Sequence, residues 1–263
     1  SSRGREPNET KFMRYLSSND FKGASRSLNS MAVATLNEPN QDQLKSLYPH
    51  PENDQPDMTC PPCEETEFMR TDDDEIREQL EAMHASAPGK SKISIKHLRQ
   101  LVRTDERVLQ AITKVANAIL LWEEGCDDPR LLKLTEARGV GLVKDETSGK
   151  LRTIVVNEAI LNVVARIALK KLRGSILDAL HEDDYGFSRA GGTENISQTL
   201  NALLHFHQQR NMPFVLLQLD FENAFNSTFR QAIFDSIWRK CPGFLPFARF
   251  RYGYLKILFR DSR

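Results

Sequence analysis

The stretch GVGLVKDETSGKLRTIVV, residues 139–156, differs in character from the sequence around it. Two runs rich in valine, leucine and isoleucine flank Asp145–Gly149, whose composition is that of a turn. Two such runs joined by turn residues predict a β-hairpin over 139–156. Because most of the remaining sequence has helical periodicity, we expect an α+β protein that is mostly helical and contains a small amount of sheet.

Helical patterns lie on both sides of the predicted hairpin. The carboxylates of Asp72–Glu75 suit the positive N-terminal end of a helix. The proline-rich residues 48–63 are expected to be extended or loop, and Ala87–Lys90 is predicted to be a loop. Further helices are predicted within 10–31 and over about 40–44, 95–103, 105–122, 158–172, 191–209 and 228–240.

An apolar run, PFVLLQLD, occupies Pro213–Asp220. Its length and nearly uninterrupted apolar character predict a buried strand. Such a strand delivers one carboxylate, that of Asp220, at its C-terminal end, where open sheets place functional groups. Nucleotidyl transfer with two metal ions needs a carboxylate on a rigid element of this kind. The same side chain could instead cap the following helix, so the strand pattern alone leaves both roles open.

The composition is that of an ordinary globular protein. The 263 residues carry 36 Lys+Arg and 36 Asp+Glu, and 40% of them are hydrophobic. No apolar run approaches the roughly 18 residues needed to cross a bilayer, so we expect no membrane partner. Four cysteines do not make a disulfide scaffold, which favours a reducing, intracellular compartment. Cys60 and Cys63 have the spacing of metal ligands, but without a second such pair we favour free thiols in a loop.

Charge is distributed unevenly along the chain. Residues 54–90 contain 11 acidic and 3 basic side chains, whereas residues 91–173 contain 16 basic and 10 acidic ones. The basic stretch is suited to contact with RNA phosphates. Near its start lie the cations that we predict as nucleic-acid contacts: Lys92, Lys96, Arg99 and Arg103. An alternative is a protein-interaction role, in which the acidic segment 64–81 binds a basic partner.

An ordered set of motifs resembles reverse transcriptases of the non-LTR retrotransposon type. Residues Asp220–Ser227, DFENAFNS, resemble the first catalytic motif of that family. Upstream, residues 185–194 contain YGF and GGTE and resemble its F/YG and GG-x-E segment. Lys144 with Arg152–Ile154 resembles the hairpin of its fingers subdomain, and residues 87–98 resemble its APG and HL segment. The likeness spans most of the chain.

The resemblance implies a domain organisation. Residues 1–90 would form a helical N-terminal extension with a proline-rich, acidic linker. Residues 91–210 would form a fingers-like region that contains the hairpin 139–156. Residues 211–263 would form a partial palm with a short sheet.

The resemblance also implies roles for individual residues. Asp220 would be a metal-binding carboxylate, and the backbone carbonyl of Phe221 would assist it. Phe225 would lie under the sugar and screen the 2′-hydroxyl. Lys144 and Arg152 would bind the nucleotide triphosphate, since phosphoryl transfer needs cations around the phosphate oxygens.

Some family features are not found in this sequence. Thr153 stands where the family usually has proline, and no aromatic-Ala-Asp-Asp motif follows Asp220. The later aspartates, Asp235 and Asp261, are not adjacent. A single carboxylate strand supplies too few oxygens for two Mg²⁺ ions. We therefore expect this chain alone to need no cofactor and to lack polymerase activity, with Mg²⁺ required only if another chain or segment completes the site.

Two functional hypotheses follow. In the first, the protein derives from a reverse transcriptase, Asp220 is vestigial, and the chain is a structural subunit that contacts RNA in a ribonucleoprotein. A ribosome, for example a mitochondrial one, would supply its RNA and protein partners. In the alternative, the chain is the N-terminal part of an active RNA-directed DNA polymerase of a retroelement, and its partner is the remaining half of the polymerase.

Overall fold

The computed structural model describes residues 33–50, 52–59, 68–84, 87–123, 128–145, 147–181, 184–186 and 190–259. The helices predicted within 10–31 and the pair Cys60 and Cys63 lie outside these residues. The chain divides into two compact units, which we describe separately. The hairpin unit comprises Ser1–Ser46, Arg138–Val155 and Leu258–Arg263, and the helical unit comprises Leu47–Ala137 and Val156–Ile257.

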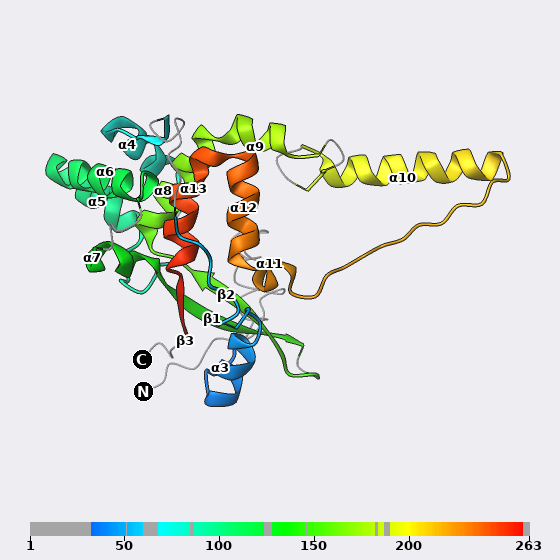
Figure 1. Ribbon diagram of the computed structural model, residues 1–263, viewed down its shortest axis with the longest axis horizontal. Helices are drawn as coiled ribbons and strands as arrows, with labels where there is room; N and C mark the ends of the chain where they lie inside the picture. The colour runs from blue at the N-terminus through cyan, green and yellow to red at the C-terminus, as the bar shows by residue number, and fades with distance from the viewer. Residues whose placement is uncertain are drawn as a thin grey trace, which may run out of the picture. The chain divides into compact units, whose positions relative to one another are not determined.

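The described residues form an α+β structure, as predicted (Figure 1). Strands β1 (Glu136–Asp145), β2 (Lys150–Val156) and β3 (Lys256–Phe259) make a sheet with the order β2-β1-β3. The longer helices are α3 (Glu38–Lys45), α4 (Asp73–Ala82), α5 (Ile95–Thr104), α6 (Glu106–Leu120), α8 (Ala159–Lys171), α10 (Gly192–Gln209) and α12 (Arg230–Lys240). Shorter turns of helix are α7 (Pro129–Leu132), η2 (Lys133–Thr135), α9 (Arg173–Ala179), α11 (Ala224–Ser227), η3 (Pro242–Phe244), α13 (Leu245–Ala248) and η4 (Arg249–Gly253).

The hairpin unit consists of the predicted hairpin and a helix that covers it. Strand β1 pairs with β2, and Ala34 donates its backbone N–H to the carbonyl of Gly141 at 2.9 Å. Gly141 faces Leu44 of α3, and a Cβ at this position would come within 2.9 Å of the leucine Cδ1 atom. The absence of a side chain therefore lets α3 lie close against β1.

The helical unit has a core built from amphipathic helices. Helices α4, α5, α6 and α8 pack against one another. In α6 the apolar residues Leu109, Ile112, Ala116 and Ile119 recur at helical spacing, and all four are buried. Their spacing places them on one face, which explains why the sequence pattern located this helix well.

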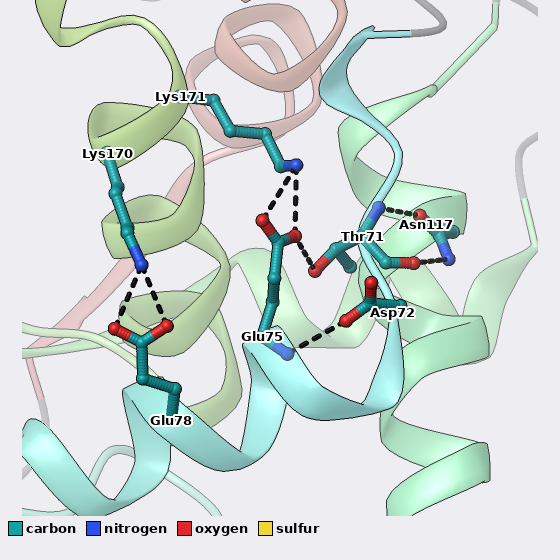
Figure 2. A network of polar contacts seen from close by, with 7 residues as sticks. All are labelled: Thr71, Asp72, Glu75, Glu78, Asn117, Lys170 and Lys171. Carbon is teal, nitrogen blue, oxygen red and sulfur yellow. Dashed lines mark hydrogen bonds and ion pairs between the residues drawn. The ribbon is translucent and has the colours of Figure 1, made fainter.

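A network of polar contacts joins three of these helices (Figure 2). Asp72 caps α4 by accepting the backbone N–H of Glu75 at 2.8 Å, as the acidic run predicted. The side-chain oxygen of Asn117 in α6 accepts the backbone N–H of Thr71 at 2.8 Å, and its nitrogen donates to the Thr71 carbonyl at 2.9 Å. Asn117 thus fixes the start of α4 against α6.

Three acidic side chains of α4 form ion pairs with cations of other helices. Glu75 pairs with Lys171 of α8 at 2.9 Å, and Glu78 pairs with Lys170 at 2.7 Å. Glu81, in the last turn of α4, pairs with an arginine of α5. Three carboxylates of the acidic segment therefore pair with cations of the basic stretch within the helical unit.

The prediction of a buried strand at Pro213–Asp220 was wrong. Residues 212–221 are without helix or strand, and Val215 and Leu217 are 88% and 76% exposed. An apolar segment becomes a buried strand only when other strands pair with its backbone and other layers cover its faces. The described residues supply neither the pairing strands nor the covering layers for this segment. The third strand of the sheet is instead β3, which the sequence analysis did not predict.

Candidate nucleic-acid interface

Lys144 and Arg152 lie on the two strands of the hairpin. Lys144 is near the end of β1, and Arg152 is in β2 beyond the turn. Both side chains are exposed, and neither forms an ion pair or hydrogen bond within the described part of the chain. The hairpin therefore presents two cations that are available to an external anion.

The alternation of the strands explains this exposure. Along β1 the odd-numbered Ala137, Gly139 and Gly141 are buried, so the even-numbered Lys144 belongs to the opposite face. Along β2 the exposed positions are also alternate ones, namely Lys150, Arg152 and Ile154. The alternation therefore keeps Lys144 and Arg152 off the buried faces of their strands.

The first-motif residues lie in the helical unit and are exposed. Asp220 is exposed at the end of the extended segment, Phe221 is 74% exposed and Phe225 is 98% exposed. The N-cap of the following helix α11 is Asn223, so the alternative in which Asp220 caps that helix was wrong. Nothing in the described residues holds Phe225 in the position under the sugar that the resemblance implies.

The described residues do not by themselves fit the Mg²⁺ ion that the resemblance implies. Among them, no group of three or more histidine, cysteine, aspartate or glutamate side chains is placed to hold one metal ion. Magnesium is bound in near-octahedral geometry by oxygen ligands, and the carboxylate of Asp220 would supply only part of such a set. The predicted roles of Asp220 and of the Phe221 carbonyl stay predictions.

The four cations predicted as nucleic-acid contacts fall into two groups. Arg99 donates to the carbonyls of Leu80, Glu81 and Met83, and Arg103 pairs with Glu81 at 2.9 Å. These two arginines hold the end of α4. Lys92 and Lys96 are exposed and form no ion pair within the described residues, so they remain available for a nucleic acid.

A cluster of lysines around Glu136 was missed by the sequence analysis. Lys90 donates to the Glu136 carboxylate, and this bond, together with the charges of Lys256 and Lys133, lowers the pKa of Glu136. The lysines come from three separate segments of the helical unit. Lys133 is close to Glu136 in the sequence, but only the fold brings Lys90 and Lys256 to this carboxylate, so no local sequence signal could have identified the cluster.

The chain matches no protein-family model, no curated protein and no solved structure with which it was compared. The resemblance to reverse transcriptases therefore rests on the sequence motifs. No helix in the described part of the chain combines the length and the apolar character that a membrane-crossing segment needs.

Proposed function

We propose that this protein derives from a reverse transcriptase and contacts RNA as a structural, non-catalytic subunit of a ribonucleoprotein. One observation carries the proposal: Lys144 and Arg152 are exposed on the hairpin and have no partner within the described residues. An exposed cation without a carboxylate partner can bind a phosphate without first breaking an existing ion pair.

Neutralising both hairpin cations is expected to weaken RNA binding. In Lys144→Gln/Arg152→Gln the affinity for a labelled RNA at moderate salt falls roughly tenfold, and the slope of log affinity against log salt decreases by about 0.7 for each lost contact. Fluorescence anisotropy over a salt series measures both quantities. The matched control is Lys114→Gln/Arg166→Gln, which removes the same charge from two exposed helical positions.

The assembly part of the proposal is tested with the same double variant. In a cell lysate the wild-type protein sediments with a large particle that RNase disperses, and a smaller fraction of the double variant does so. Slow sedimentation of the wild-type protein that RNase does not change contradicts the ribonucleoprotein role. Equal RNA affinity of the wild-type protein and the hairpin variant contradicts the role of Lys144 and Arg152.

A second candidate is an RNA-directed DNA polymerase whose catalytic site is completed by another chain or segment. The segment 213–219 favours it, because its consecutive apolar side chains Val215, Leu216 and Leu217 are all exposed. That pattern is typical of a central strand covered on both sides. Strands from elsewhere that pair with this segment would also bring further carboxylates beside Asp220.

This candidate predicts that Asp220→Asn abolishes primer extension on an RNA template by the native full-length protein or complex. The loss should exceed about a thousandfold, because an electrostatic group in the reacting site contributes several kcal/mol. The control is Asp235→Asn, on the exposed side of α12, which keeps an acceptor for the Gln231 side chain. A native complex without primer extension, or one unaffected by Asp220→Asn, excludes the polymerase.

A further inference from the structure

One carboxylate at the start of β1 has a lysine hydrogen-bonded to it and two further lysines within electrostatic range. Glu136, the first residue of β1, accepts a hydrogen bond from Lys90. The charges of Lys256 and Lys133 also act on this carboxylate. The side chains of Lys90 and Glu136 are 50% and 22% exposed, so the cluster lies at the surface.

The cluster has an excess of positive charge. Glu136 is satisfied by its hydrogen bond with Lys90. Lys133 and Lys256 are both exposed, and neither has an ion-pair partner within the described residues. Because one negative charge faces three positive ones, the local potential attracts anions.

Buried polar groups hold two of these lysines near each other. The hydroxyl oxygen of Thr135, which is 1% exposed, lies 2.8 Å from the carbonyl oxygens of both Leu132 and Tyr254, which share its one hydrogen. This contact joins η2, which carries Lys133, to the residues just before β3, which begins with Lys256. The backbone positions of these two lysines are therefore fixed before any ligand arrives.

The turn that carries Lys90 is fixed as well. The buried carboxylate of Glu158 accepts the backbone N–H of Ser91 at 2.8 Å and also the Ser91 hydroxyl. A Cβ on Gly89 would lie 2.8 Å from the carbonyl oxygen of Asn157, so this turn lies directly against the start of α8. A fixed turn loses little conformational entropy when its lysine binds an anion.

We infer that Lys90, Lys133 and Lys256 form a phosphate-binding surface for RNA in the helical unit, with Glu136 limiting its affinity. RNA is the partner that fits, because a phosphate backbone offers several anions in a row to lysines that come from separate segments. The inference rests on the proposed RNA-contacting function and adds a surface that no sequence motif marks.

Lys133→Gln/Lys256→Gln is expected to weaken RNA binding several-fold and to reduce the salt slope by about 0.7 for each lysine that contacts a phosphate. Glu136→Gln is expected to act in the opposite direction. It removes the negative charge and frees Lys90, so the affinity should rise about threefold and the salt slope should increase. Anisotropy titrations of the whole chain with a labelled RNA measure both variants, and circular dichroism confirms that each is folded.

The outcomes separate this inference from the proposed function. If the hairpin variant Lys144→Gln/Arg152→Gln binds RNA weakly but Lys133→Gln/Lys256→Gln binds like the wild-type protein, this surface is overturned and the proposed function stands. That same result is expected if the lysines instead bind an acidic protein. A loss no larger than in Lys114→Gln/Arg166→Gln, or no gain in Glu136→Gln, also overturns the inference. If the wild-type chain binds no RNA, both proposals fail.

Discussion

Replacing Arg230 by methionine is expected to lower the free energy of unfolding by about 3 kcal/mol. Arg230 begins α12, and its guanidinium donates to the carboxylate of Asp54 at 2.7 Å and to the Asp54 carbonyl. It also donates to the Gly253 carbonyl at 3.1 Å. One side chain therefore joins the loop at 54, the start of α12 and the end of η4.

The size of the effect follows from burial. The side chain of Asp54 is 9% exposed and that of Arg230 is 24% exposed. Truncating the arginine removes the charged donor of a buried carboxylate, which still accepts the backbone N–H of residue 230 at 2.8 Å, and it removes the side-chain donor of the Asp54 carbonyl. Methionine keeps most of the apolar stem. Urea unfolding followed by circular dichroism measures the change, and we expect a lower midpoint with an unchanged slope.

Two further variants test the mechanism at Arg230. Arg230→Lys keeps the charge but loses the forked geometry, and it should recover less than half of the lost stability. Asp54→Asn combined with Arg230→Met should cost less than the sum of the two single changes, because the unpaired carboxylate is gone. Additive effects, or a loss below about 1 kcal/mol for Arg230→Met, would show that this contact does not hold the three segments together.

Local sequence patterns predicted most of the described fold, because most of its helices and its hairpin depend on residues that are close together in the sequence. Asp72 was identified as a helix start from the acidic run, and it caps α4. The apolar spacing of Leu109 and Ile112 predicted α6, and the turn residues that follow β1 predicted the hairpin. In each case the residues that form the element also carry the signal.

The failures involve partners distant in sequence. Pro213–Asp220 has the composition of a buried strand, but no strand among the described residues pairs with it. Arg230 has its carboxylate partner, Asp54, 176 positions away. The segments that carry Lys133 and Lys256 are likewise distant in sequence and are joined by the contact of Thr135 with Tyr254. Contacts of this kind have no periodicity for a sequence pattern to reveal.

Arg99 illustrates how a basic residue that is predicted to contact a nucleic acid can have partners within the protein. It was predicted to contact a nucleic acid, yet its guanidinium donates to the carbonyls of Leu80, Glu81 and Met83 at the end of α4. The last carbonyls of a helix have no partner within the helix, and here Leu80 and Met83 are buried, so water cannot replace the arginine. Arg99→Met is therefore expected to lower the free energy of unfolding by about 3 kcal/mol.

The matched control for Arg99 lies one turn further along α5. Arg103 also contacts the end of α4, but its pair with Glu81 is exposed, so Arg103→Met should cost no more than about 0.5 kcal/mol. Urea unfolding compares the two variants. RNA affinity gives a second readout, measured at a temperature where the variants are folded. Arg99→Lys keeps the charge and should bind RNA like the wild-type protein while still losing stability. If Arg99→Lys keeps full stability but binds RNA more weakly, Arg99 is a nucleic-acid contact. Lysine keeps the charge but lacks the forked guanidinium, so such a loss would show that the guanidinium binds a phosphate.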